Sequence, residues 1–267
     1  ASGTQTLSLN NHSLTIADSS HVGSGGQIIL GSGDILGTGT LTNQGLIYGD
    51  SVQNIIDTPL VNRGVLQFRG GGNQLNGSFV NEAGATLRLI GHRSPNCCTF
   101  WLSTAELTVA NGFTNHGDID FQHDVTNGGA LRVTAGTLVN LGRIFTSLGP
   151  EAIAADFAHV LEAQLDNQGT VLVGHDFEIN KVGAQHVNRG TIDVQEDMLT
   201  IDDAAGIHNT GTFAISGSGR LTVESSTLTH DGTLTAPSSV TCSPNPAQHT
   251  RGACAVTLDN STLTLNA

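Results

Sequence analysis

Two aspartates and a histidine on one short segment are the residues of this chain best suited to acid–base chemistry. Asp118 and Asp120 stand two positions apart, and His123 follows them. On an extended strand, side chains i and i+2 share one face about 6–7 Å apart, a separation of the order that paired carboxylates use to cleave polysaccharides. A carbohydrate-active enzyme, a lyase or a hydrolase, is therefore one hypothesis. Outward polar residues are also ordinary strand patterning, and that interpretation, with no catalytic residue, is the one we favour.

An aromatic pair suggests binding rather than catalysis. Phe100 and Trp101 lie in a chain that has one Trp and in which 4% of the residues are aromatic. Exposed rings can stack on a sugar, so Phe100 and Trp101 are the candidate residues of a glycan-binding module. The alternative, which we favour, is that both rings fold back over the apolar interior.

Acidic residues gather in one repeat of the chain, at Asp193, Glu196, Asp197, Asp202 and Asp203. Because Ca²⁺ takes about six to eight oxygen ligands, a structural calcium ion is one interpretation of this group. A solvated acidic surface is the interpretation we favour. We expect no other cofactor and no metal centre, since the chain has no Cys-x-x-Cys pair and its histidines and cysteines are not grouped.

The four cysteines, Cys97, Cys98, Cys242 and Cys254, allow three pairings. We expect a local disulfide between Cys242 and Cys254, which leaves Cys97 and Cys98 as a vicinal disulfide or as two thiols; pairing between the two groups is the alternative. An even number of cysteines and a surface rich in Thr, Asn and Gly favour an oxidising environment. The sequence thus predicts a secreted, extracellular protein at a cell surface.

The net charge of −13 makes nucleic acid and anionic membranes poor partners for this chain. The ten Lys and Arg residues are scattered and form no basic patch. No apolar run is long enough to cross a bilayer, so we expect no membrane insertion.

A short phrase recurs along the chain: an apolar residue, a spacer, Asn, any residue and Gly, followed by an alternating apolar run. Its asparagines are Asn43, Asn62, Asn81, Asn115, Asn140, Asn167, Asn188 and Asn209, with His230 in the ninth place. The spacing is 19 residues in the early copies and 21 residues in the late ones. A fixed period of this length is typical of a solenoid.

Alternation inside each repeat predicts strands with one apolar face. One coil per repeat, with parallel pairing between coils, stacks these side chains into an inner row, Val171, Ile192, Phe213 and Leu234, beside an outer row, Thr170, Thr191, Thr212 and Thr233. The sequence therefore predicts an all-β fold, a parallel β-helix of 19–21 residues per coil that spans 1–267 as one domain. The crossover rule makes it right-handed.

We interpret the Asn-x-Gly phrase as the corner of the coil. Asn and Gly both tolerate the left-handed backbone that we expect at a sharp corner. Stacked Asn side chains can also hydrogen-bond between coils that lie about 4.8 Å apart. This geometry accounts for the phrase without any ligand.

Three insertions interrupt the period, at 91–104, 148–164 and 235–254. Insertions in repeat arrays map to surface loops, where function concentrates. In the second insertion Ile153, Phe157, Val160 and Leu161 have helical spacing, which predicts a short helix.

The two ends of the chain carry similar apolar pairs: Leu7, Leu9, Leu14 and Ile16 near the start, and Val256, Leu258, Leu263 and Leu265 near the finish. Their equal spacing predicts that both ends lie in the same phase of the coil, and neither has an evident polar cap. We expect both ends to stack on further coils, supplied by other copies of the chain or by the rest of a longer solenoid.

The phrases that begin at Leu41, Phe113 and His186 (LTNQGLI, FTNHGDI and HVNRGTI) resemble the repeats of bacterial surface β-solenoids, both filamentous-haemagglutinin-type proteins and autotransporter passenger domains. The resemblance implies a right-handed parallel β-helix, secretion, and a role as adhesin, stalk or filament. It brings no functional residues, because such repeats carry none. The expected function is that of a non-enzymatic structural or adhesive protein, with surface glycans as candidate partners; the polysaccharide-cleaving enzyme and the glycan-binding module are the alternatives.

Overall fold

Each alternating run forms a short strand that is buried on one side. In β20 (Thr170–Val173), Val171 and Val173 point inward and are 0% exposed, whereas Thr170 on the other face is partly exposed. Apolar β-branched side chains fit this half-buried pleated surface, which is why they dominate the inner positions.

The computed structural model describes residues 3–50, 53–93, 102–123, 128–149, 158–236, 256–259 and 262–265. Every regular element in this part of the chain is a strand. Each strand pairs in parallel with its counterparts in the adjacent coils, except that β13 (Thr86–Arg93) also pairs antiparallel with β14 (Leu102–Ser103). The prediction of an all-β parallel β-helix is confirmed. The described residues hold no helix of the length and apolarity that a membrane crossing would need.

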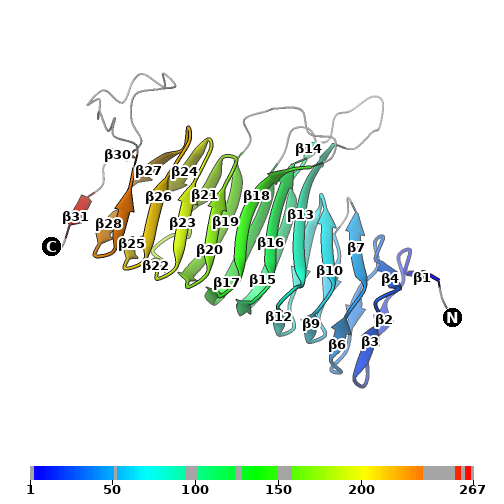
Figure 1. The fold of residues 1–267 in the computed structure, drawn as a ribbon. Helices are drawn as coiled ribbons and strands as arrows, with labels where there is room; N and C mark the ends of the chain where they lie inside the picture. Colours follow the sequence, from blue (N-terminus) through cyan, green and yellow to red (C-terminus); the bar gives the residue numbers. More distant parts are fainter. Residues whose placement is uncertain are drawn as a thin grey trace.

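Three rows of strands, A, B and C in chain order within each coil, form the sides of the solenoid (Figure 1). Row A contains β1 (Gln5–Ser8), β4 (Gly26–Ile29), β7 (Leu46–Asp50), β10 (Val65–Arg69), β13, β16 (Asp118–His123), β18 (Arg143–Leu148), β20, β23 (Thr191–Val194), β26 (Thr212–Ile215) and β29 (Thr233–Thr235). Row B contains β2 (Leu14–Thr15), β5 (Ile35–Leu36), β8 (Ile55–Ile56), β11 (Gly72–Leu75), β21 (Phe177–Ile179), β24 (Met198–Ile201), β27 (Arg220–Glu224) and β30 (Val256–Asp259). Row C contains β3 (Ser20–Val22), β6 (Leu41–Asn43), β9 (Leu60–Asn62), β12 (Phe79–Asn81), β22 (Gln185–Asn188), β25 (Gly206–Asn209), β28 (Thr227–His230) and β31 (Thr262–Leu265). Three long strands run through row B and then row C: β15 (Ala105–Asn115), β17 (Gly129–Asn140) and β19 (His159–Asn167).

The predicted rows of side chains are present in the observed register. Val171 pairs with Ile192, Ile192 with Phe213, and Phe213 with Leu234. The threonine row Thr170, Thr191, Thr212 and Thr233 follows the same register one residue earlier. One continuous apolar core fills the space between the three rows. The two ends of the chain lie at opposite ends of the stack (Figure 1), which at about 4.8 Å per coil is about 50 Å long.

Four interruptions of the coil occur between row A and row B, at what we call the A–B corner, and a smaller irregularity lies between rows B and C, where the register of β17 against β19 shifts. The segments 94–101, 124–127, 150–157 and 237–255, whose structure is not described, each lie between a row A strand and the next row B strand, with β14 standing between 94–101 and β15. The sequence prediction missed the interruption at 124–127. The prediction also extended the second insertion, 148–164, too far toward the C-terminus, because residues 159–164 belong to β19. The helical prediction is wrong for Val160 and Leu161, which lie on opposite faces of that strand.

The phase of the two ends differs from the prediction by one strand. Leu7 lies in row A, where β1 pairs with β4. Val256 and Leu258, its expected equivalents, lie in row B, where β30 pairs with β27. The C-terminal strands β30 and β31 therefore correspond to β2 and β3, and the first row A strand has no counterpart after β31 among the described residues.

The corner between row C and row A, which we call the C–A corner, carries a ladder of buried amides. All eight asparagines of the repeat are 0% exposed. Each Nδ2 donates to Oδ1 of the next Asn at 2.5–2.8 Å, and the last bond, from Asn209, ends on Nδ1 of His230 at 2.8 Å. The second amide proton goes to backbone, as in the bond from Asn140 Nδ2 to Thr170 O at 3.2 Å. Stacking of the corner asparagines is thus confirmed.

The reason for glycine at this corner is not the one predicted. None of the eight asparagines has a positive φ, nor do the glycines that follow two residues later, such as Gly169 and Gly190. Consecutive coils instead approach so closely that a Cβ on Gly190 would lie 2.1 Å from the carbonyl oxygen of Gly169. The prediction of a left-handed corner is therefore wrong for these copies, where glycine is required for close backbone approach; it holds for the third copy, in which the delayed Gly84 has a φ of +79°.

Candidate functional site

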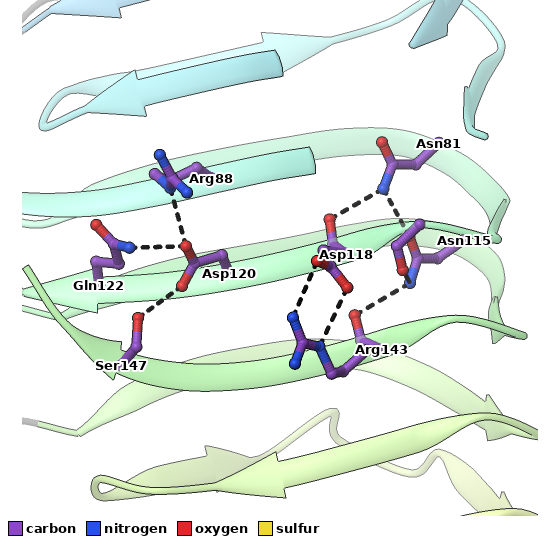
Figure 2. A network of polar contacts seen from close by, with 9 residues as sticks. Asn81, Arg88, Asn115, Asp118, Asp120, Gln122, Arg143 and Ser147 are labelled. Carbon is purple, nitrogen blue, oxygen red and sulfur yellow. Dashed lines mark hydrogen bonds and ion pairs between the residues drawn. The ribbon is translucent and has the colours of Figure 1, made fainter. Parts of the chain in front are cut away.

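The two candidate carboxylates lie on the outer face of β16, as the alternation predicted. Asp118 and Asp120 point away from the core, whereas Ile119 and Phe121 between and beyond them are 0% exposed. Figure 2 shows both carboxylates engaged with side chains of the neighbouring row A strands, β13 and β18.

Asp118 forms a two-point ion pair with the coil that follows. Arg143 donates from Nε to Oδ1 at 3.1 Å and from Nη2 to Oδ2 at 3.0 Å. The same guanidinium stacks on Phe145, with its Cζ 4.1 Å from the ring centroid. Bidentate pairing and stacking both fix the arginine, so Asp118 serves as an anchor between β16 and β18.

Asp120 is more deeply enclosed, with only 2% of its side chain exposed. Its Oδ2 accepts bonds from Arg88 Nε at 2.9 Å and from Gln122 Nε2 at 2.7 Å, and its Oδ1 accepts one from Ser147 Oγ at 2.8 Å. Three donors, one of them a guanidinium, thus occupy the Asp120 carboxylate, and this arrangement cross-links β16 to the strands on either side.

His123, the third member of the predicted group, points to the other side of the sheet. It follows Ile119 and Phe121 on the inner face of β16 and is 1% exposed. The structure therefore brings Asp118 and Asp120 together on the surface but separates both from His123. The geometry joins three coils of row A electrostatically and does not assemble a catalytic dyad with a histidine.

Several other predicted residues lie outside the described part of the chain. These are Phe100, Trp101 and the four cysteines Cys97, Cys98, Cys242 and Cys254. The binding and disulfide predictions made for them stay predictions. Of the predicted stacking residues, Leu7 is 46% exposed at the first coil, while Leu9 and Ile16 are each 5% exposed and belong to the core.

The acidic group of the later coils is spread over separate local contacts. Asp193 accepts bonds from Gln195 and Ser216, Asp197 lies 3.4 Å from His175, and Asp202 accepts the backbone N–H of Asp203. Within the described ranges no three His, Cys, Asp or Glu side chains converge on a point where they could hold a metal ion.

A cluster of three imidazoles at the A–B corner was not predicted from the sequence. His123 Nδ1 lies 3.4 Å from His159 Nε2, and the ring centroids of His123 and His175 are 5.3 Å apart. His159 is 0% exposed, and its Nδ1 accepts the Gly129 N–H at 2.9 Å. Burial, reinforced by the neighbouring histidines His123 and His175, lowers the pKa of His159 from 6.5 to about 3. The alternation Ile119, Phe121, His123 was the available signal that one of these rings points inward.

A fourth buried histidine replaces an aliphatic residue in row C. His186 is 0% exposed, pairs with Ile207 in the next coil, and accepts the Leu165 N–H on its Nδ1 at 3.2 Å. Its Nε2 has no hydrogen-bond partner among the described residues. Burial lowers the pKa of His186 from 6.5 to about 4.

Comparison of the chain with protein-family models, with curated protein sequences and with solved structures finds no match. Fold and site are therefore interpreted from their own geometry.

Proposed function

We propose that this chain is a structural and adhesive segment of an extracellular β-solenoid rod, part of a cell-surface fibre or a larger filamentous assembly. In this role the coils form a stiff scaffold, and the insertions carry whatever contact the rod makes with its surroundings. Surface glycans are the partners we propose for the insertions, with Phe100 and Trp101 as the stacking residues.

The observation that carries this proposal is the segregation of the interruptions. Four interruptions fall at the A–B corner, while the Asn ladder at the C–A corner continues through the same coils, bridging Asn81 to Asn115 across 34 residues at 2.7 Å. A repeat scaffold that accepts insertions along one edge suits the display of loops in a line, and insertions in solenoids often form the binding face.

The surface chemistry also favours a scaffold. Arg88, Asp120, Asp118 and Arg143 link neighbouring strands of row A, and Arg132 lies between Glu106 and Glu162 on row B. Carboxylates engaged in this way stabilise the stack through a network and are poorly placed for acid–base catalysis.

Assembly end to end would use the open edge of the first coil. Gln5 donates its N–H to the carbonyl of Gly25, just before β4, and Leu9 donates to Ile29, the last residue of β4. The alternating N–H groups of Thr6 and Ser8 therefore face away from the stack. Leu7 adds a side chain that is 46% exposed at the same end. A further coil, from another copy or from more of the same solenoid, would pair with these groups.

The assembly arm of the proposal is tested by electron microscopy and sedimentation over a range of concentrations. The wild-type chain should form rods that lengthen by end-to-end association. Ser8→Pro should abolish association without unfolding, because it removes only an outward N–H. Particles that stay single at every concentration, or association that survives Ser8→Pro, would contradict the stacking.

The adhesive arm is tested by binding to a panel of immobilised surface polysaccharides. Trp101→Ala should weaken binding at least tenfold, whereas Leu141→Ala, which removes an exposed side chain at the opposite C–A corner, should leave it unchanged. Release of reducing or unsaturated sugars, lost in Asp120→Asn, would instead support the enzyme.

A further inference from the structure

The three imidazoles at the A–B corner sit where two strands meet an interruption of the coil. His123 is the last residue of β16, and His159 is the first residue of β19. His175 follows β20 in the next coil and packs edge-on against His123, with an angle of 86° between the rings. The cluster thus joins three successive coils at a different corner from the asparagine ladder that follows row C.

The hydrogen bond from Gly129 requires a neutral His159 ring. Because the Gly129 N–H donates to Nδ1 of His159, the proton of the neutral ring lies on Nε2, which faces Nδ1 of His123. Protonation of His159 would place a second proton on Nδ1 and break the bond to Gly129. It would also put a charge beside Phe121, whose ring centroid lies 5.9 Å away.

The ion pair of the cluster lies at His175 rather than at His159. Asp197 lies 3.4 Å from Nδ1 of His175 at the solvent side, and Asp176 accepts the Met198 N–H at 3.0 Å. Asp120, on the same strand as His123, faces outward and is held by Arg88. On the inner side the cluster is packed against Phe121 and Phe177, whose ring centroids are 5.3 Å apart.

We propose that His123, His159 and His175 form an acid-sensitive lock, which holds the C-terminal end of β16, the N-terminal end of β19 and the residues after β20 together at neutral pH and lets them separate locally when the surroundings become acidic. This goes beyond the proposed scaffold role, since it gives the rod a local response that the Asn ladder, with its non-titrating amides, does not share. The ladder would hold the coils together while the opposite corner opens.

The sign and size of the response follow from proton linkage. The pKa of His159 is lowered to about 3 in the closed corner and returns to about 6.5 once the ring is solvated. The open form therefore binds the proton first as the pH falls. Below the open-state pKa the equilibrium shifts toward opening by about tenfold per pH unit, which from this ring alone amounts to about sixteenfold between pH 6.5 and pH 5 and about 25-fold between pH 7 and pH 5.

Hydrogen exchange read by mass spectrometry tests the lock in the full chain, at pH 7 and pH 5 with times scaled for intrinsic exchange. Protection of peptides from β16 and β19 should fall about ten- to thirty-fold at pH 5, while peptides from β9 and β10 should keep theirs. His159→Asn, whose Oδ1 can still accept the Gly129 N–H, should reduce the fall to about threefold or less. His21→Asn, at an exposed histidine of β3, should behave as wild type.

Equal protection of β16 and β19 at both pH values, or a full loss of protection in His159→Asn, would overturn the proposal. Imidazole ¹⁵N spectra of the wild-type chain give a reading that does not depend on any variant. His159 should remain the neutral Nε2–H form at pH 5, and titration near 6.5 would also overturn it.

Discussion

The C–A corner repeats the same asparagine through eight coils, whereas the A–B corner is interrupted at 94–101, 124–127, 150–157 and 237–255. The difference follows from what holds each corner. A ladder of amides works only if every coil places the same atoms at the same height, so an insertion there would break bonds on both sides. The A–B corner is held by contacts that differ from coil to coil, including one amide bond from Asn54 to Asn73 at 2.7 Å, and such contacts tolerate a longer connection. The four interruptions therefore lie at the corner that can accept them, while the corner between rows B and C shows a register shift in β17.

The two corners also divide two roles: one stabilises the stack, and the other varies from coil to coil. At the C–A corner every coil depends on its neighbours through buried hydrogen bonds, which are costly to leave unmade. At the A–B corner the contacts are particular to each coil, as the three histidines and their phenylalanine neighbours show. Substitutions at the two corners should accordingly lower the free energy of unfolding by different amounts.

The largest effect is expected at the middle of the ladder. Asn140→Leu leaves the Asn115 amide proton, the Asn167 Oδ1 and the Thr170 carbonyl without their partner. At about 1–3 kcal/mol for each buried unsatisfied group, the free energy of unfolding should fall by about 4–5 kcal/mol. Urea denaturation measures it, with the adjacent Leu141→Ala, 43% exposed, as the near-neutral control. Equal losses in the two variants would show that the ladder is not what holds this corner.

A second effect tests close approach at the same corner. In Gly190→Ala the new Cβ would lie 2.1 Å from the Gly169 carbonyl oxygen, so two coils must separate. Forced backbone shifts of this kind cost up to about 3 kcal/mol. The control is Gly72→Ala, where a Cβ would meet nothing within 4 Å. If thermal unfolding showed both variants as stable as wild type, the spacing of the coils would not be what selects glycine.

Much of the scaffold could be predicted because the strands are short and repeated. Alternation around Val171 and Ile192 shows which side chains are buried, and the constant spacing of Asn43, Asn62 and Asn81 shows which residues stack. The role of glycine could not be predicted in the same way. Its cause is a distance between two coils, which no single repeat contains, whereas a left-handed turn is a local property that sequence reasoning reaches first.

The candidate site was predictable only within one strand. That Asp118 and Asp120 share a face follows from their spacing, but their partners Arg88 and Arg143 lie 32 and 25 residues away, across interrupted repeats. Register across an interruption is not visible in the sequence. Near 160, helical spacing of apolar residues competed with the alternation of His159, Leu161 and Ala163, and the strand prevailed because those side chains join the continuous core.

A third effect concerns the buried histidine next to the ladder, His186. Its pKa is lowered from 6.5 to about 4 by burial, so the unfolded chain takes up a proton that the folded chain resists. The contribution of the neutral His186 ring to the free energy of unfolding is then present above about pH 6.5 and is lost as the pH falls toward 4. The loss is about 2 kcal/mol at pH 5. In His186→Leu, which matches the aliphatic neighbours Leu165 and Ile207, that share of the acid loss should disappear. Urea denaturation at pH 7.5 and pH 5 measures it, and the exposed-site variant His21→Gln should keep the wild-type slope.

The smallest effect concerns the third corner, between rows B and C. Lys181 Nζ donates to the carbonyls of Val133 at 2.5 Å and Thr134 at 3.1 Å, at the point where the register between β17 and β19 shifts. The ammonium group of Lys181, from a later coil, thus binds carbonyls of β17 at the point where the pairing of β17 with β19 is irregular. Lys181→Met should lower the unfolding free energy by about 1–2 kcal/mol, against almost nothing for Val182→Ala, which is 79% exposed. Hydrogen exchange should show the loss confined to β17 and β19, because the bonds replaced are local; a loss spread evenly over all coils would mean that irregular corners, too, depend on their neighbours as the ladder does.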